Sequence, residues 1–305
     1  MWLDGVVSSC PPGRHLTSMY TAYFNLKENP YTIDTNLDSK WFYLSPSHKE
    51  NALRCEWAIR NQASLVAIYG NYGTGKSSIV LELVNRFSDK SKFFVAVLTD
   101  TTQTSDTAFV RAVAKEFGLE KPPRTKQETI DQLQDLLTHE KINQNRTPLL
   151  FIDDAHKYGD RKRIRSDRDI LDTLHTLTNL RHERVRLLHT LLFGQLELYD
   201  YLEQRPALFS RVAEFGFLSP LSPEESRKML EHRWQAAKGT LPLPFENKVL
   251  DLILKESKNL PRHTIKLCNA ALELAFAFRQ KQATVANAQE AIRKYQKKGG
   301  EEDGE

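Results

Sequence analysis

One eight-residue segment constrains this chain of 305 residues more than any other feature. It reads Gly70-Asn71-Tyr72-Gly73-Thr74-Gly75-Lys76-Ser77 and fits the pattern G-x-x-x-x-G-K-[ST] at every fixed position. A short apolar run, residues 64–69, precedes it, and a helical pattern, residues 76–87, follows it. Glycines here let backbone N–H groups turn inward around a phosphate at the N-terminus of a helix. The segment therefore predicts a phosphate-binding loop between a buried strand and a helix.

The polar residues that end this loop indicate ATP and Mg²⁺ as its ligands. Lys76 is expected to reach the β- and γ-phosphates, and the hydroxyl of Ser77 is expected to ligate the metal. A glycine-rich turn without a ligand is the alternative interpretation. The candidate nucleotide-binding residues are Gly70, Asn71, Tyr72, Gly73, Thr74, Gly75, Lys76, Ser77 and Ser78.

A second acidic element supports the first. The apolar segment 148–152 ends in Asp153 and Asp154. Asp153 is expected to hold the Mg²⁺, and Asp154 stands where a catalytic glutamate often orients the attacking water. Aspartate is one methylene shorter than glutamate, so we expect slow hydrolysis. Two acids that only cap the next helix are the alternative.

Strands and helices alternate along the first two thirds of the chain. Four apolar strands are predicted at residues 64–69, 93–98, 148–152 and 187–193, and helices are predicted at 48–61, 76–87, 106–117 and 126–139. Continuously apolar strands separated by helices favour a parallel α/β sheet that is covered on both faces. From residue 219 onward only helical patterns remain, and Ser222-Pro223-Glu224-Glu225 forms a capping box that opens the first of them.

Four regions follow from these patterns. Residues 1–47 form an aromatic-rich lead-in, 48–218 an α/β ATPase domain, 219–297 a small helical lid, and 298–305 a charged tail that is expected to be disordered.

The composition mainly excludes classes of protein. The 43 Lys and Arg residues nearly balance the 39 Asp and Glu residues, so the total charge permits nucleic-acid binding without requiring it. No apolar run approaches the roughly 20 residues that span a bilayer, and the N-terminus lacks the apolar core of a signal peptide. The three scattered cysteines form no CxxC pair. We therefore expect a cytoplasmic protein without membrane insertion, disulfides or structural zinc.

With these motifs in place, the chain resembles AAA+ ATPases, and more narrowly the ExeA/GspA-type ATPases and the TniB/TnsC/MuB-type transposition ATPases. The resemblance covers roughly residues 19–280. Its carriers are Met19-Tyr20 to Pro30-Tyr31, Phe42 to His48, the phosphate loop, Gly194-Gln195-Leu196-Glu197-Leu198, Leu218 to Glu225, and Pro261-Arg262. The chain departs from the ExeA pattern at Asp154, where glutamate is usual, and in a longer segment after it.

The resemblance implies further site residues. Gln195 stands where the class places a polar sensor near the γ-phosphate, and Arg262 matches the arginine of the sensor-2 motif. An arginine from a neighbouring subunit completes such sites. Arg211 matches that position best and Arg205 is the alternative, although either fits a surface arginine equally well. Aromatic residues near Tyr43 are expected to pack on the adenine or simply in the core.

The longer segment after Asp154, residues 157–169 and called the basic segment below, carries six Lys and Arg residues and three Asp residues. In AAA+ assemblies the loop at this position tends to face a central channel, where repeated arginines would follow a phosphate backbone without reading bases. A solvated loop whose charges pair with nearby aspartates is the alternative. The candidate DNA-binding residues are Lys157, Arg161, Lys162, Arg163, Arg165 and Arg168.

These features favour an ATP-dependent regulator that forms a ring or helical filament on duplex DNA. The resemblance suggests target selection in DNA transposition, with a transposase or target selector as partner. One alternative is an ExeA-type secretion-assembly ATPase that does not act on DNA. The other is an ATP-binding scaffold that scarcely hydrolyses its ligand.

Overall fold

The structure is a computed structural model that describes residues 20–33, 39–160 and 170–302. Its contacts divide the chain into two compact units. One consists of Leu44–Ser219 and is called the α/β unit below. The other consists of Met1–Tyr43 and Pro220–Glu305 and is called the helical unit. The described residues of the aromatic lead-in up to Tyr43 therefore pack with the C-terminal helices.

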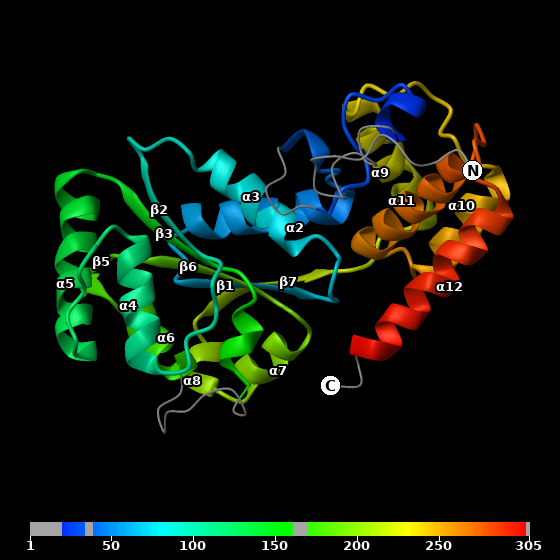
Figure 1. The fold of residues 1–305 in the computed structure, drawn as a ribbon. Helices are drawn as coiled ribbons and strands as arrows, with labels where there is room; N and C mark the ends of the chain where they lie inside the picture. The colour runs from blue at the N-terminus through cyan, green and yellow to red at the C-terminus, as the bar shows by residue number, and fades with distance from the viewer. Residues whose placement is uncertain (1–19, 34–38, 161–169, 303–305) are drawn as a thin grey trace, which may run out of the picture. The chain divides into compact units, whose positions relative to one another are not determined.

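Five parallel strands form the sheet of the α/β unit (Figure 1). They are β1 (Leu65–Gly70), β2 (Phe93–Leu98), β3 (Thr147–Ile152), β6 (His189–Gly194) and β7 (Val212–Leu218), in the order β2-β3-β6-β1-β7. The sequence predicted four of these strands, so β7 corrects that count. Glu214 and Gly216 interrupt the apolar pattern of β7, and pairing with β1 makes it a strand.

Side chains from the two faces of the sheet enter two separate cores. Ala67, Leu150 and Leu192 lie in one core, and Ile68 and Phe151 lie in the other. Successive residues of a strand point to opposite faces, so strands with both sets buried must be covered on both sides. The predicted α/β class with a doubly covered parallel sheet is confirmed.

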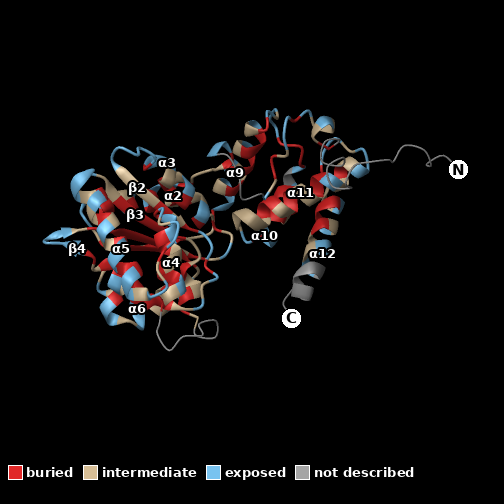
Figure 2. Cartoon of the chain, turned by 60° about the vertical axis from the view of Figure 1, so that its left-hand side comes forward, coloured by how far each residue is buried: buried red, intermediate tan, exposed pale blue. Residues whose placement is uncertain are grey.

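Within the described part of the α/β unit, seven helices connect and cover the strands. Helices α2 and α3 cover one face, and α4, α5 and α6 cover the other (Figure 1). Their bounds are α2 (Pro46–Arg60), α3 (Lys76–Arg86), α4 (Asp106–Glu116), α5 (Lys126–Thr138), α6 (Ile170–Thr178), α7 (Glu197–Glu203) and α8 (Pro206–Phe209), with the 3₁₀ turn η3 (Ala155–Tyr158) and the π turn η2 (His139–Asn143) between them. A hairpin of β4 (Arg181–His182) and β5 (Val185–Arg186) projects as an exposed arm (Figure 2). Helix α6 and this hairpin did not emerge from the sequence pattern.

Local chemistry explains where several of these helices start. Ser45, Ser105 and Thr125 stand directly before α2, α4 and α5, and each side-chain oxygen accepts a hydrogen bond from the backbone N–H three residues later. Such caps satisfy N–H groups that have no partner inside the helix. Ser45 also places Pro46 at the first helical position of α2, where its missing N–H costs no hydrogen bond.

The helical unit contains η1 (Ser39–Trp41), α9 (Pro223–Ala236), α10 (Asn247–Glu256), α11 (Pro261–Ala277) and α12 (Val285–Glu302). The predicted capping box at Ser222 and Glu225 is present at the start of α9. Tyr31 and Trp41 of the lead-in are buried in the same core as Trp234 of α9. Helix α12 runs to Glu302, beyond the boundary at residue 297 where the sequence predicted a disordered tail.

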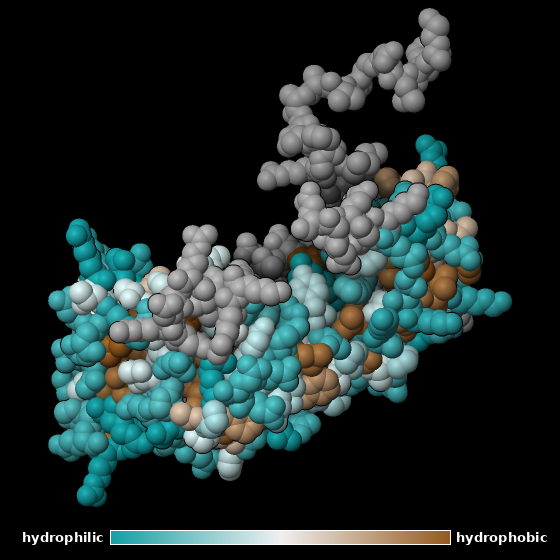
Figure 3. Space-filling view, turned by 90° about the horizontal axis from the view of Figure 1, so that it is seen from below, coloured by the Kyte–Doolittle hydropathy of each residue, from teal (hydrophilic) through white to brown (hydrophobic). Residues whose placement is uncertain are grey.

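In the view of Figure 3, hydrophilic side chains dominate, and apolar ones gather in small patches. Within residues 20–33, 39–160 and 170–302, none of the helices combines the length and the apolar character that crossing a membrane requires.

Candidate nucleotide-binding site

The phosphate loop connects the carboxyl end of β1 to the first turn of α3. Gly73 and Gly75 have φ angles of 79° and 101°, a region that glycine enters at no steric cost. Gly75 directly precedes Lys76, the first residue of α3. The loop thus leads into a helix N-terminus, which attracts an anion through its unpaired N–H groups and its dipole.

Lys76 is almost buried, with 7% of its surface exposed. Its ammonium group donates to the carbonyls of Gly70 (2.9 Å) and Asn71 (2.8 Å), the first two residues of the loop. Burial lowers the pKa of Lys76, and the charges of Asp153 and Asp154 oppose this shift. The side chain therefore brings a positive charge to the loop in a place where a phosphate would meet little competing water.

Ser77 and Asp153 join the two sequence motifs. The hydroxyl of Ser77 donates to Oδ2 of Asp153 at 2.6 Å. Burial raises the pKa of Asp153, while the hydrogen bond from Ser77 stabilises its carboxylate. A hydroxyl oxygen beside a carboxylate fits Mg²⁺, which prefers hard oxygen ligands. These two residues are the ones that would hold the ion.

Asp154 occupies a special backbone position directly after Asp153. Its φ angle is 52°, in the left-handed region that aspartate tolerates better than most residues. Its N–H donates to Oδ1 of Asp153 at 3.0 Å, and its own carboxylate accepts a hydrogen bond from Lys157 at 2.7 Å. The proposed water-orienting acid is thus bound to the first residue of the basic segment.

Strand β6 lies between β1 and β3, so Gln195 at its carboxyl end starts between the phosphate loop and Asp153. Two further titratable groups of this region were missed in the sequence. Glu197, in the first turn of α7, interacts electrostatically with both Lys76 and His156. Burial lowers the pKa of His156, and the charges of Asp154 and Glu197 oppose that shift. The Gly194–Leu198 segment pointed to Glu197, but no spacing assigned it a role.

Arg211 lies at the end of the sheet where β1 and β7 begin, and the phosphate loop lies at the other end, where β1 finishes. The register of β7 on β1 pairs Val212 with Leu65 and Leu218 with Gly70, so Arg211 is level with the start of β1. The phosphate loop follows the end of β1, roughly 20 Å away at ~3.3 Å per residue. Arg205 stands at the start of α8 and donates to the carbonyl of Tyr201.

The remaining candidates fall elsewhere. Arg262 lies in the first turn of α11 in the helical unit. Among the six candidate DNA-binding residues, Lys157 is the one that the structure describes, and it bonds to Asp154. Arg161, Lys162, Arg163, Arg165 and Arg168 lie outside the described residues.

A buried histidine also contacts the loop, and the sequence did not predict it. His48 is 3% exposed, and its Nε2 lies 3.0 Å from the carbonyl oxygen of Thr74. In the sequence His48 stands only at the end of the segment Phe42 to His48, which carries the family resemblance, and no role follows for it from that. Its position three residues after the cap Ser45 was the available signal.

The parallel five-stranded sheet, the helices on both faces and the helical unit after it are the fold of P-loop NTPases of the AAA+ type. Residues 59–202 match the protein family described as "AAA domain". The chain is 26% identical over 264 residues to the general secretion pathway protein A of Aeromonas hydrophila. That match covers 85% of this chain but only 45% of the relative, so the chain spans less than half of it.

Solved structures share the fold at low sequence identity. The ORC2 protein of Aeropyrum pernix in its ADPNP-ADP complexes superposes with a TM-score of 0.63 at 17% identity, over 87% of this chain and 71% of that one. Drosophila ORC bound to DNA superposes with a TM-score of 0.63 at 14% identity, over 96% of this chain and 69% of that one. The Aeropyrum pernix ORC1 protein in complex with DNA superposes with a TM-score of 0.64 at 17% identity, over 87% of this chain and 68% of that one. At these identities the likeness establishes the AAA+ fold alone.

Proposed function

We propose that the chain is an ATP-dependent switch that assembles on duplex DNA. The hydrogen bond between Ser77 and Asp153 carries the nucleotide part of this proposal, because it brings the two motifs into one site. With ATP bound, Lys76 would neutralise phosphate charge and Gln195 would contact the γ-phosphate. Mg²⁺, held by Ser77 and Asp153, would supply additional neutralisation of the phosphates.

Hydrolysis is assigned to Asp154, which would orient the attacking water. Its carboxylate is one methylene shorter than that of glutamate, and in the free protein it bonds to Lys157. Both features favour a slow reaction. A slow reaction suits a switch, in which ATP binding promotes assembly and hydrolysis ends it.

The DNA part of the proposal rests on the segment that begins at Lys157. Its arginines and lysines would bind the phosphate backbone without reading bases, so affinity would fall steeply with salt. Since Lys157 bonds to Asp154, a phosphate that draws Lys157 away would release the catalytic carboxylate. We therefore expect DNA to stimulate hydrolysis. Neighbours of the same fold that were solved with DNA support this choice of partner.

A nucleotide site shared between subunits would tie assembly to nucleotide state. The position of Arg211, far from the phosphate loop of its own chain, suits an arginine that acts on a neighbour. We propose a ring or filament of identical subunits that recruits a transposase or target-selector protein, and a role in transposition target selection. The cytoplasm is the compartment in which we expect this activity.

DNA-bound assembly measured with ATP, ADP and a non-hydrolysable ATP analogue tests the proposal. Wild-type protein should assemble with ATP and the analogue but not with ADP, and Lys76→Ala should fail with all three. Assembly that ignores the nucleotide would refute the switch.

A role in secretion is the second candidate, and the match to the general secretion pathway protein A favours it. The two functions differ in their response to DNA. Hydrolysis rates with and without duplex DNA separate them, because only the DNA-bound switch predicts stimulation. Nucleotide binding without turnover under either condition would point instead to an ATP-binding scaffold.

A further inference from the structure

His48 links the start of α2 to the phosphate loop. Its ring lies between two partners, with Nδ1 at 2.7 Å from the hydroxyl of Ser45 and Nε2 at 3.0 Å from the carbonyl oxygen of Thr74. The N–H of His48 also bonds to the same hydroxyl, since Ser45 caps α2. Ser45, His48 and Thr74 are all buried. The imidazole is therefore held at both ends and has no freedom to turn.

The partners determine which nitrogen carries the proton. A carbonyl oxygen only accepts hydrogen bonds, so Nε2 of His48 must be the donor to Thr74. In the neutral imidazole, Nδ1 then accepts from the hydroxyl of Ser45. Nε2 also packs directly against the next residue, because a Cβ added to Gly75 would lie 2.6 Å from it.

This contact fixes one peptide group of the loop. A trans peptide is planar, and its C=O and N–H point in opposite directions. Because the carbonyl of Thr74 turns toward His48, the N–H of Gly75 turns away from α2. Gly73 and Gly75 adopt φ values of 79° and 101°, so sterics alone restrain this peptide weakly. An external partner is what keeps it in one orientation.

We propose that His48 is a positioning residue for phosphate binding, which holds the Gly75 N–H toward the β-phosphate of the bound nucleotide. This inference rests on the proposed nucleotide site. It gives α2, which precedes the loop by a whole strand, a direct part in preparing the anion cradle. Without the histidine, the Thr74–Gly75 peptide would sample other orientations, and phosphate binding would have to select the correct one.

Two substitutions of His48 test whether phosphate binding depends on the hydrogen-bond donor at Nε2. In His48→Gln the side-chain amide can place a donor where Nε2 stands, whereas His48→Leu fills similar space without a donor. We expect His48→Leu to weaken ATP and ADP binding about tenfold, the effect of losing one buried hydrogen bond. His48→Gln should restore affinity to within roughly threefold of wild type. AMP, which has no β-phosphate, should bind all three proteins equally.

His189 is a matched control in the same unit. It is also buried, and its Nδ1 bonds to the carbonyl of Ala63, away from the loop at the start of β1. His189→Leu should lower thermal stability as His48→Leu does, yet leave ADP affinity unchanged. Equal ADP affinity in folded His48→Leu and wild type, or failure of His48→Gln to restore it, would overturn the inference. Wild-type protein that binds no nucleotide would instead refute the proposed function.

Discussion

At the residue scale, His189 shows how burial turns a side chain into a pH-dependent element of stability. Its Nδ1 donates to the carbonyl of Ala63, and its Nε2 has no hydrogen-bond partner among the described residues. Burial lowers its pKa from the ordinary 6.5 to about 4. A second proton would have to enter the core without an acceptor. The folded protein therefore keeps this histidine neutral where the unfolded chain is already charged.

The sign of the stability effect follows from this difference. As pH falls from 6.5 to about 4, the unfolded chain binds a proton that the folded protein refuses, so the free energy of unfolding decreases by up to about 3 kcal/mol. His189→Asn keeps a donor for the Ala63 carbonyl but does not titrate. Urea denaturation at several pH values should show a shallower loss of stability for this variant over that window. Parallel curves for variant and wild type would contradict the assigned pKa.

The candidate nucleotide site shows what the sequence could reveal about single residues. The phosphate-loop motif and the acidic end of the strand 148–152 predicted one metal site for Ser77 and Asp153, and in the structure the Ser77 hydroxyl donates to Asp153. The bond between Asp154 and Lys157 and the contact of His48 with Thr74 have no such signature. They depend on side-chain orientation after folding, which spacing alone does not determine.

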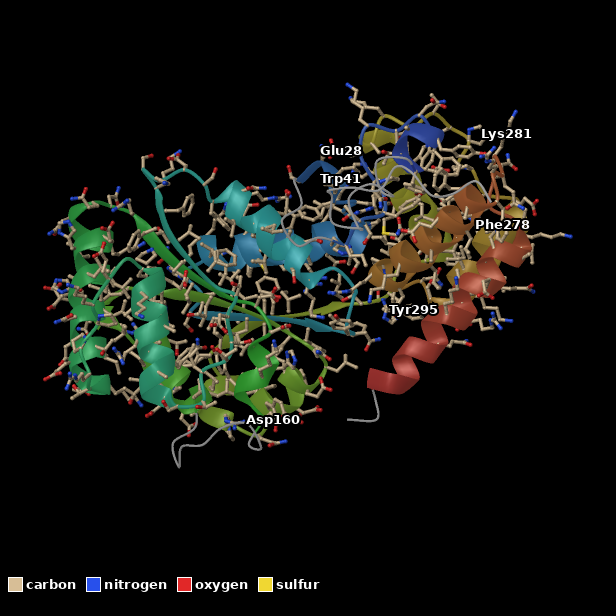
Figure 4. The ribbon with its side chains drawn as sticks, viewed as in Figure 1. Glu28, Trp41, Asp160, Phe278, Lys281 and Tyr295 are labelled. Carbon is tan, nitrogen blue, oxygen red and sulfur yellow. The ribbon has the colours of Figure 1, made fainter. Side chains whose placement is uncertain are left out.

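At the element scale, a buried arginine of α9 binds three backbone carbonyls of the lead-in. Arg233 of α9 is 4% exposed and donates to the carbonyls of Pro30 (2.7 Å), Thr32 (2.7 Å) and Trp41 (3.1 Å). Its guanidinium also lies over the ring of Trp41, at 5.5 Å from the centroid. Trp41 is labelled in Figure 4. One side chain of α9 thus donates to all three of these carbonyls.

Removing this guanidinium should loosen the lead-in. Arg233→Met keeps the apolar stem but leaves the three carbonyls without their donors, which should cost roughly 3 kcal/mol. Hydrogen exchange should then accelerate in peptides that cover residues 20–33. Arg227→Met on the same helix, where the arginine forms an exposed ion pair with Asp251, is the control and should change little. Equal exchange in both variants would show that Arg233 does not hold the segment.

Elements with strong local signals were predicted, and those that depend on distant partners were not. The strand 93–98 and the start of α9 at its capping box agree with the sequence. Strand β7 was missed because its stability comes from pairing with β1, far away in the chain. Its Gly216 is required by that environment, since a Cβ there would lie 2.0 Å from Oδ1 of Asn51.

At the scale of the whole molecule, the near balance of charges hides a local surplus in the proposed DNA-binding segment. Replacing Arg161, Lys162, Arg163 and Arg165 by Gln should weaken duplex binding and reduce the slope of log K against log salt. The slope should fall by about 0.9 for each phosphate contact that is lost. ATP affinity should remain unchanged. Arg181→Gln together with Arg184→Gln, on the exposed β4–β5 hairpin, is the control and should preserve the slope.

Within one chain, the phosphate loop and Arg211 lie at opposite ends of the sheet's strands. A role for Arg211 in hydrolysis therefore requires a second subunit. A mixing experiment exploits this geometry. Lys76→Ala subunits lack the loop lysine but retain Arg211, and Arg211→Ala subunits have the reverse defect. Each variant alone should be inactive, because every shared site lacks one of the two groups. In an equal mixture, about a quarter of the interfaces should combine an intact loop with an intact arginine.

ATP hydrolysis by the mixture should therefore rise to about a quarter of the wild-type rate. The same experiment with Arg205→Ala in place of Arg211→Ala tests the alternative arginine. Arg205 donates to the carbonyl of Tyr201 in its own chain, so we expect this substitution alone to leave hydrolysis largely intact. Recovery in the Arg205 mixture but not in the Arg211 mixture would reverse the assignment. If hydrolysis is not recovered in either mixture, neither arginine completes a neighbour's site, and the γ-phosphate charge is neutralised within one chain.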